Sequence, residues 1–311
     1  MKMRTASLLT LIALLLLSSC TIQLAKDIFD YDENPFLNPE TIAEPHEEGT
    51  IRFLAFSDLH INRSATQSDV TERYEEIINV IECGKKEEKF DFIMNLGDLN
   101  DSGDINEPRF IDFIDALSAS GIPSVNLLGN HELHKTKDKS IWENFFRGKE
   151  GLYGPVGCYR IGDSLSIYAL DNSQRLFTVK QLQYLEEAIA SDESRYKILI
   201  MHENITSGQA DDHSSVLIGT ADTAERNRVY RLMAEYGAGL MLCGHHHMGD
   251  IKTPHKGFYE LNLAAAHTCS SFMESEGYYY IGTLDTATGK LKIDCFKSSD
   301  SSLYREYEFT I

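Results

Sequence analysis

The sequence predicts an α/β fold, because short apolar runs alternate with amphipathic stretches over most of its length. The chain has 311 residues, of which 42% are hydrophobic. This composition supports one large core and excludes a disordered chain. With 48 Asp and Glu against 29 Lys and Arg, the formal net charge is −19. That charge speaks against a general nucleic-acid binder, and an anionic ligand would need local positive charge, for example from a metal ion.

The N-terminal segment is predicted to be a targeting signal. Lys2 and Arg4 precede an almost wholly apolar run over 6–17, which is shorter than the roughly 20 residues of a membrane span. Leu17-Ser18-Ser19-Cys20 then resembles the lipobox of bacterial lipoproteins, in which the Cys becomes the lipidated first residue. We therefore expect residues 1–19 to be a signal peptide. Cys20 is expected to anchor an exported protein to a membrane of the bacterial cell envelope, on its periplasmic or extracellular face.

Residues 20–50 are predicted to be an acidic tether, and residues 51–311 to be the folded domain. Residues 21–50 hold eight acidic residues against Lys26, and part of this stretch can pack on the domain through Phe29, Tyr31 and Phe36. Apart from Cys20 the chain has five cysteines, an odd number, so at least one thiol stays free or pairs between chains.

Five apolar runs are predicted to be buried strands, over 53–56, 92–94, 125–128, 198–201 and 240–243. Apolar residues at helical spacing predict helices between them, over 70–81, 110–117, 182–189 and 229–236. Residues 159–170 and the region after 257 are richer in strand-forming residues, with a hairpin turn expected at 286–290. The alternation favours parallel strands joined by right-handed crossovers.

A polar cluster follows each of the five apolar runs. In chain order the clusters are Ser57-Asp58-Leu59-His60, Gly97-Asp98-Leu99-Asn100-Asp101, Gly129-Asn130-His131-Glu132, His202 and Gly244-His245-His246-His247. Taken alone, each has an ordinary explanation as a turn, a helix cap, a surface pair or a core histidine. Because ligands of α/β sheets bind beyond the carboxyl ends of the strands, the ordered set favours one common cleft.

These clusters offer a mixed set of oxygen and imidazole donors that is typical of transition-metal sites. The candidate ligands are Asp58, His60, Asp98, Asn130, His202, His245 and His247. Such a set suits Mn, Fe or Zn better than Ca, which prefers oxygen alone. Seven ligands exceed the needs of one tetrahedral ion, whereas two ions about 3.5–4 Å apart that share a carboxylate use them all. Asp98 follows a glycine at a strand end and is the expected bridge.

The ordered blocks DxH, GDxxD, GNHE, H and GHxH, from Asp58 to His247, resemble the signature of calcineurin-like metallophosphoesterases. The resemblance implies a four-layer α/β/β/α sandwich with two mixed β-sheets. It also implies that one ion is held by Asp58, His60, Asp98 and His247, and the other by Asp98, Asn130, His202 and His245. His131 resembles the catalytic histidine of the family, and Asp101 the carboxylate that orients this histidine in the phosphoprotein phosphatase branch.

The GDxxD block narrows the branch that the sequence resembles. It lacks the following Arg-Gly of protein phosphatases, and it ends in Asp101 rather than in the metal-binding Tyr of purple acid phosphatases. The remaining resemblance is to the small phosphodiesterase and phosphomonoesterase branch. The predicted activity is hydrolysis of a small phosphomonoester or phosphodiester by direct attack of a metal-bound hydroxide, with two transition-metal ions as cofactors and His131 as the acid.

Two alternatives stand beside this prediction. The first is a non-catalytic surface lipoprotein that keeps the metal site for binding, although such a protein is expected to have lost His131 or a ligand. The second is a dinuclear hydrolase of non-phosphate bonds.

We expect no nucleic-acid binding beyond a nucleotide as a candidate substrate, and infer no protein partner. Arg63, His134 and Lys135 are candidate substrate contacts, and the loop over 203–222 is a candidate cover of the cleft.

Overall fold

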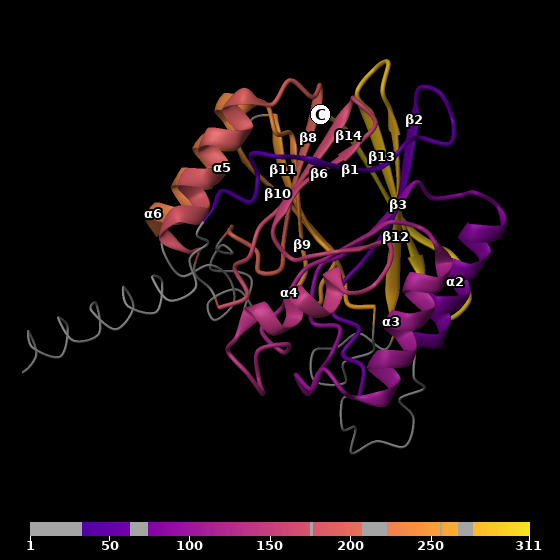
Figure 1. Cartoon of the computed structure of the whole chain (residues 1–311). Coiled ribbons are helices and arrows are strands. Elements are labelled where there is room, and N and C mark those ends of the chain that lie inside the picture. The colour runs from indigo at the N-terminus through magenta and orange to yellow at the C-terminus, as the bar shows by residue number, and fades with distance from the viewer. Residues whose placement is uncertain (1–32, 63–73, 175–176, 207–222, 256, 267–275) are drawn as a thin grey trace, which may run out of the picture.

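Two β-sheets lie face to face between two outer layers of helices (Figure 1). The fold comes from a computed structural model, which describes residues 33–62, 74–174, 177–206, 223–255, 257–266 and 276–311. The predicted signal peptide, Cys20, Arg63, Cys269 and residues 207–222 lie outside the described residues. Across this described part of the chain, no helix combines the length and the apolar character that a membrane span requires.

The first sheet has the strand order β1-β6-β7-β8-β9-β11-β10. Its strands are β1 (Glu40–Ala43), β6 (Gly157–Ile161), β7 (Leu165–Ala169), β8 (Tyr196–Met201), β9 (Leu240–Cys243), β10 (Asp250–His255) and β11 (Phe258–Asn262). The three central strands β7, β8 and β9 run parallel to one another, whereas β6 and β10 run antiparallel to their neighbours β7 and β11. The sheet is therefore mixed, as expected.

The second sheet has the order β14-β13-β12-β2-β3-β4-β5. Its strands are β2 (Thr50–Phe56), β3 (Phe92–Asn95), β4 (Ser124–Asn126), β5 (Leu152–Tyr153), β12 (Tyr278–Asp285), β13 (Lys290–Lys297) and β14 (Leu303–Thr310). β2 to β5 are parallel, and β12 to β14 form an antiparallel meander that pairs with β2. The expected hairpin turn joins β12 to β13, where Gly289 has the positive φ of 76° that such turns need.

The helices cover the outer faces of the two sheets. α2 (Tyr74–Lys86) and α3 (Pro108–Ser120) pack on the second sheet, and α5 (Val179–Ser191) and α6 (Thr223–Tyr236) pack on the first. α4 (Lys139–Arg147) buries Trp142 and Phe146 in the same core as α2 and α3. The described residues thus form the predicted four-layer α/β/β/α sandwich.

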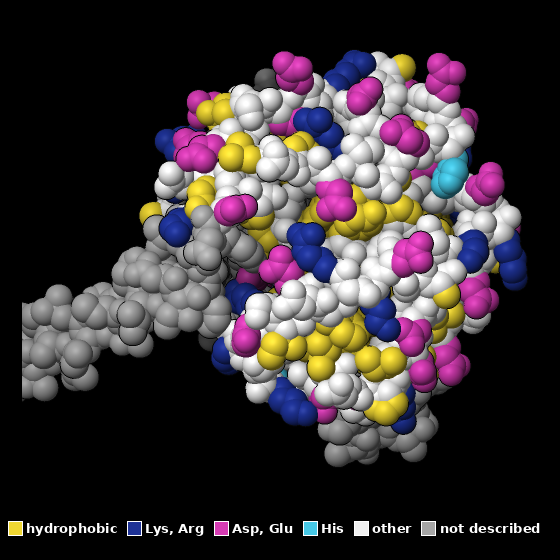
Figure 2. Space-filling view, viewed as in Figure 1, with side chains coloured by type: hydrophobic (Ala, Val, Ile, Leu, Met, Phe, Trp, Pro, Cys, Tyr) yellow, Lys and Arg dark blue, Asp and Glu magenta, His cyan; other side chains and the backbone are white. Residues whose placement is uncertain are grey.

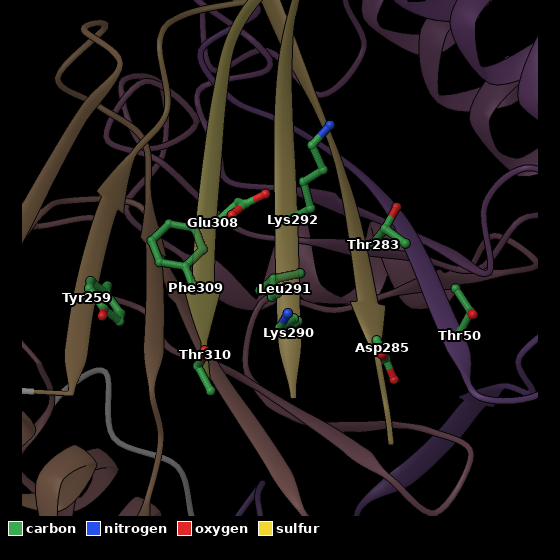
Figure 3. Close-up of a pocket in the computed structure, with 10 residues that line it drawn as sticks. All are labelled: Thr50, Tyr259, Thr283, Asp285, Lys290, Leu291, Lys292, Glu308, Phe309 and Thr310. Carbon is green, nitrogen blue, oxygen red and sulfur yellow. The ribbon is translucent and has the colours of Figure 1, made fainter. Parts of the chain in front are cut away.

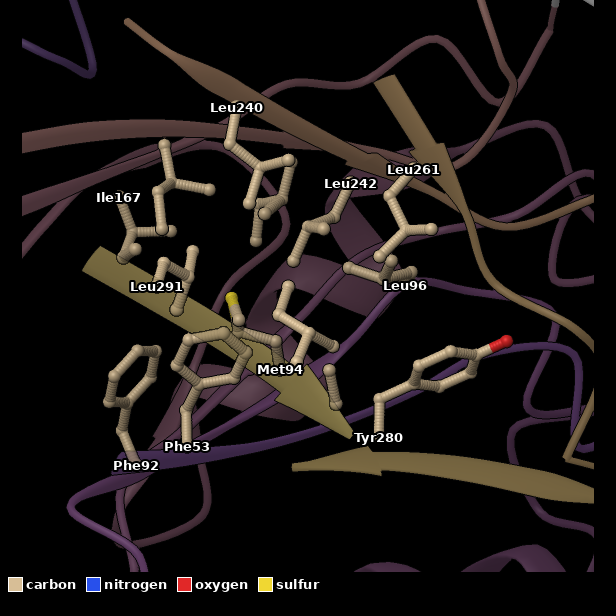
Figure 4. Close-up of a cluster of buried hydrophobic side chains, with 14 of the residues drawn as sticks. Phe53, Phe92, Met94, Leu96, Ile167, Leu240, Leu242, Leu261, Tyr280 and Leu291 are labelled. Atoms are coloured by element: carbon tan, nitrogen blue, oxygen red, sulfur yellow. The ribbon is translucent and has the colours of Figure 1, made fainter. Parts of the chain in front are cut away.

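Three apolar layers hold the sandwich together. Along β2, Phe53 and Ala55 point into the layer between the sheets, whereas Leu54 and Phe56 point toward the helices. Because both faces of the strand are covered, its sequence is a continuous apolar run rather than an alternating one. Figure 4 shows the central layer, to which Phe53 and Met94 of one sheet and Leu242 of the other contribute.

The folded part of the chain begins earlier than the boundary predicted at residue 51. Phe36 is buried against Tyr168, and β1 pairs in parallel with β6 at the edge of the first sheet. Part of the predicted tether, from Phe36 to the end of β1, therefore packs on the domain, as expected for Phe36. The four-residue β1 was not predicted, because its pairing partner lies more than 100 positions further along the chain.

Acidic and basic side chains alternate over the face of the molecule seen in Figure 2, rather than gathering in one large patch of either sign. Exposed ion pairs of this kind contribute little to stability, typically about 0–1 kcal/mol each. The fold is thus held mainly by the three apolar layers.

Candidate metal centre

The seven predicted ligands lie just beyond the ends of five parallel strands. Asp58 and His60 follow β2, Asp98 follows β3 and Asn130 follows β4, whereas His202 follows β8 and the pair His245 and His247 follows β9. The structure brings the ligand atoms of their carboxylates and imidazoles to within 4.8 Å of one another in two groups, Asp58–His60–His247 and Asp98–His202–His245. A third group of this kind, His60–Asp98–His131, joins the first two.

The atoms of the first two groups converge closely. Nε2 of His247 lies 3.2 Å from Oδ1 of Asp58 and 3.1 Å from Nε2 of His60. In the second group, Nε2 of His202 lies 3.4 Å from Oδ2 of Asp98 and 3.2 Å from Nδ1 of His245. The same Asp98 oxygen is 3.9 Å from Nε2 of His60. Asp98 therefore stands between the two groups, which is where a bridging carboxylate has to be.

The backbone at these residues is strained. Five candidate ligands have a positive φ, namely Asp58 (56°), His60 (47°), Asp98 (53°), His245 (64°) and His247 (59°). Residues other than glycine adopt this conformation at a cost of about 1–3 kcal/mol each. Such strain is concentrated at functional sites, where the surrounding fold holds it in place.

Two motif glycines are required by close approach of the chain. A Cβ atom at Gly97 would lie 2.6 Å from the backbone nitrogen of Gly129 and 2.8 Å from Nδ1 of His202. A Cβ atom at Gly129 would lie 2.1 Å from Oδ1 of Asp98. Any side chain at either position would push the strand ends apart and displace the two ligands.

Glu132, the last residue of the GNHE block, holds two segments of the site together, the GDxxD block and its own. Its carboxylate accepts hydrogen bonds from the backbone N–H groups of Asp98 at 3.0 Å, Asn100 at 2.9 Å and Gly129 at 2.7 Å. Burial and the nearby charge of Asp98 raise the pKa of Glu132 to about 7, although the backbone N–H groups of Asn100 and Gly129 oppose this rise. The sequence placed Glu132 in the motif without assigning it this role.

The protonation of Asp98 and His245 suits a cation. Burial opposes the ionisation of Asp98, but the neighbouring imidazoles of His202 and His60 outweigh it and hold the pKa of Asp98 well below its usual range. Burial and the charge of His202 lower the pKa of His245 to about 3, so its imidazole is neutral. Ionised carboxylates and neutral imidazoles are the forms that bind metals. Burial by itself would lower the pKa of His202, but the charge of Asp98 outweighs it and raises this pKa to about 10. A bound cation would therefore have to displace the proton of His202.

Among the described residues, Oδ1 of Asn130 and Nε2 of His245 are buried at the site without a hydrogen-bond partner. Buried polar atoms are nearly always satisfied, and a bound ion is one recognised reason for an exception. Because the donor set also mixes oxygen and nitrogen, the residues present fit transition-metal ions.

Asp101 contacts two histidines at once. Its Oδ1 lies 3.0 Å from Nδ1 of His131 and 3.0 Å from Nδ1 of His60. Nδ1–H groups that donate to this carboxylate leave both Nε2 atoms directed at the centre. Burial by itself would lower the pKa of His131, but the hydrogen bond to Asp101 and the charge of Asp98 outweigh it and raise this pKa above its ordinary value. Asp101 thus connects a predicted ligand with the predicted acid.

A cavity of about 480 Å³ opens beside the second group and is lined there by Asn130 and His245. Of the candidate substrate contacts, His134 lines this cavity, whereas Lys135 instead pairs with Asp104 at 2.6 Å. A cavity of about 520 Å³ lies at the opposite ends of the strands, near the first residue of β2 and the last of β14 (Figure 3). The described lining of that second cavity contains none of the grouped ligands.

Comparison with solved structures finds proteins of the same fold. The chain is similar to a dimetal phosphatase from Danio rerio, with 12% identity, a TM-score of 0.61, and coverage of 84% of this chain and 98% of that one. It is also similar to the purple acid phosphatase PPD1 from yellow lupin (Lupinus luteus) seeds, with 16% identity, a TM-score of 0.60, and coverage of 86% of this chain and 55% of that one.

A third similar structure is that of GAP50, the anchor in the inner membrane complex of Plasmodium, with 11% identity and a TM-score of 0.59 over 85% of this chain and 90% of that one. Identities this low show a shared fold and no more. No curated protein sequence matches the chain. The sequence profile of calcineurin-like phosphoesterases, however, matches residues 51–249. The chain therefore belongs to the calcineurin-like phosphoesterase family.

Proposed function

We propose that this phosphoesterase is a dinuclear enzyme that hydrolyses a small phosphomonoester or phosphodiester. The observation that carries the proposal is the pair of ligand groups that meet at Asp98, whose Oδ2 lies 3.4 Å from His202 and 3.9 Å from His60. Mn, Fe and Zn are the metals that this donor set favours. When bound, the two ions would polarise the phosphoryl oxygens and lower the pKa of a water molecule so that it attacks phosphorus.

The ligands divide between the ions as the converging atoms suggest. Asp58, His60, Asp98 and His247 would hold one ion, and Asp98, Asn130, His202 and His245 the other. The short distances within each group support this division. Oδ1 of Asn130 has no hydrogen-bond partner within the described part of the chain, which supports its place in the second set. With both sets filled, His131 is left for a different task.

His131 would donate a proton from Nε2 to the leaving oxygen. Its Nδ1 is held by Asp101 at 3.0 Å, and its Nε2 lies 3.9 Å from Oδ2 of Asp98, at the centre of the site. Asp101 would fix the ring and stabilise its protonated form, as a carboxylate does beside other catalytic histidines. The chain itself would thus supply the acid, and no covalent nucleophile is needed.

The decisive experiment is a hydrolysis screen of the purified chain loaded with Mn²⁺, against a panel of phosphomonoesters and phosphodiesters. We expect at least one ester to be hydrolysed, and expect the Asp98→Ala variant to be inactive on it. A chain that binds two ions and hydrolyses none of the panel would instead be the non-catalytic metal-binding protein. Parallel carboxyl ester and amide substrates test for a hydrolase of non-phosphate bonds.

For the location of the protein, we propose lipidation at Cys20 and attachment to a membrane of the bacterial cell envelope. The support is the basic start, the apolar run over 6–17 and the Leu-Ser-Ser-Cys sequence that follows it. The substrate would then be a small phosphoester outside the cytoplasm.

A further inference from the structure

A sixth strand end contributes polar side chains to the same edge of the molecule. β7 ends at Ala169 and is followed, after Leu170, by Asp171-Asn172-Ser173-Gln174. Because β7 pairs in parallel with β8, this segment lies beside the residues that follow β8, which include His202. None of its side chains belongs to the ligand sets above.

The segment is rigidly held by its own contacts. Oδ1 of Asp171 accepts hydrogen bonds from N of Ser173 at 3.1 Å and from Oγ of Ser173 at 2.6 Å, and Oδ2 pairs with Lys139. Asn172 exchanges two hydrogen bonds with the backbone of Glu203, which follows His202 directly, at 2.6 and 2.9 Å. The segment is therefore tied both to α4 and to the metal centre. Since the Ser173 hydroxyl proton is donated to Asp171, the lone pairs of Oγ remain as acceptors.

The cavity of about 480 Å³ joins this segment to the metal centre. Besides Asn130 and His245, it is lined by the buried Ser173, the half-buried Gln174 and the exposed Lys137. Its size lies within the range of about 300–1,000 Å³ that is typical of small-molecule sites. Its described lining includes Leu133 and the imidazole of His134, but no Phe, Tyr or Trp. Most of the described lining can form hydrogen bonds, including Ser173, Gln174, Lys137 and the carboxylate of Glu203.

We propose that this cavity binds the leaving group of the substrate and selects a hydroxylated aliphatic group, such as a polyol or a sugar. The inference rests on the proposed function, because the proposed acid His131 would face the leaving group, and His134 of the cavity lining packs against His131 with ring centroids 4.2 Å apart. A leaving-group hydroxyl donates to Oγ of Ser173, while its oxygen accepts from Lys137 or Gln174. A hydroxyl can do both at once, which an alkyl chain cannot.

The test compares matched substrates that differ only in their hydroxyls. Glycerol 1-phosphate is paired with n-propyl phosphate, and the methyl phosphodiesters of glycerol and propanol form a second pair for a diesterase. With Mn²⁺ bound, we expect kcat/KM to favour the glycerol ester about 10-fold or more, since one hydrogen bond is worth about 2- to 10-fold. Ser173→Ala should reduce this preference about 3- to 10-fold, mainly through KM, at unchanged metal content.

The matched control is Ser191→Ala, the same change at the exposed end of α5, where the hydroxyl bonds only to carbonyls of its own helix. Lys137→Ala is the second test variant, since Lys137 is exposed and its loss leaves the fold intact.

A reduced preference in either test variant but not in the control supports the proposal. Equal kcat/KM for both esters of a pair, or a preference that survives in both test variants, overturns the cavity assignment alone. If neither pair is hydrolysed while other phosphoesters are, the cavity assignment also fails. If no phosphoester is hydrolysed, the proposed function fails with it.

Discussion

Replacing His131 with asparagine should slow hydrolysis of an alkyl phosphoester far more than hydrolysis of a nitrophenyl ester. An alkoxide is a poor leaving group and needs a proton as the bond to phosphorus breaks, whereas nitrophenolate leaves unaided. The asparagine side chain is smaller than the imidazole, and its amide is too weak an acid to give up a proton. The substitution therefore removes the acid and leaves the seven proposed ligands in place.

The geometry around His131 supports a large loss of kcat on the alkyl ester. Nδ1 of His131 lies 3.0 Å from the Asp101 carboxylate, and its Nε2 lies 3.9 Å from the Asp98 oxygen between the two ligand groups. The imidazole is thus oriented with its second nitrogen at the centre, which is the geometry of an effective acid. General-acid catalysis of this kind contributes about 10²- to 10⁴-fold, or roughly 3–5 kcal/mol of barrier. We expect kcat on the alkyl ester to fall by that factor.

The assay measures kcat for both esters in the wild type and in His131→Asn, together with bound metal by elemental analysis. Metal content should be unchanged, and the loss on the nitrophenyl ester should be clearly smaller. Equal losses on both esters would show that His131 stabilises charge on the phosphoryl oxygens instead. Loss of bound metal in the variant would refute the assignment of His131 as the acid, because it would make this residue a ligand.

Four further predictions follow from the same structure. Asp98→Ala should remove both metal ions, and Asn130→Ala should chiefly weaken one of them, as elemental analysis of the two variants will show. Cys20→Ser should leave the membrane fraction or stay unprocessed, and wild-type fractionation of this variant would contradict the lipid anchor. Glu132→Ala leaves three backbone N–H groups unsatisfied, which should lower the free energy of unfolding by at least about 3 kcal/mol in urea titrations. Burial raises the pKa of Asp171, but the charge of Lys139 outweighs it, so the folded pKa lies below its usual value. The pair should therefore stabilise the fold above about pH 4 and lose this effect as the pH falls, and Asp171→Asn should flatten that part of the stability curve.

Most of the strands and helices are readable from local pattern. The strand predicted over 240–243 is β9 with the same bounds, and the helix predicted over 110–117 is the core of α3, which extends from Pro108 to Ser120. Both succeed because burial on two faces of a strand, or on one face of a helix, leaves a periodic apolar signal in the residues themselves. The order of the polar blocks after these strands also predicted the ligands that the structure brings together in groups.

The elements that the sequence did not predict depend on distant partners. β1 is a short strand whose place is decided by β6, and α4 is a nine-residue helix that is fixed by burial of Trp142 and Phe146 against α3. The polar segment after β7 had the same signal as the other five strand ends, but the strand before it was predicted only as part of the broad region 159–170. Its link to the site depends on the pairing of β7 with β8.

The sequence by itself predicted the kind of site in this protein, since the kinds of donor and their positions after apolar runs already favour a metal centre. Only the tertiary structure decided which of those donors lie together and which residues hold them in place. The position of Asp98 between two groups, the contact of Asp101 with both His60 and His131, and the clamp formed by Glu132 all join strand ends from different parts of the chain. Such contacts depend on the register and packing of two sheets. Local sequence carries no record of them, because each is made by residues tens to hundreds of positions apart.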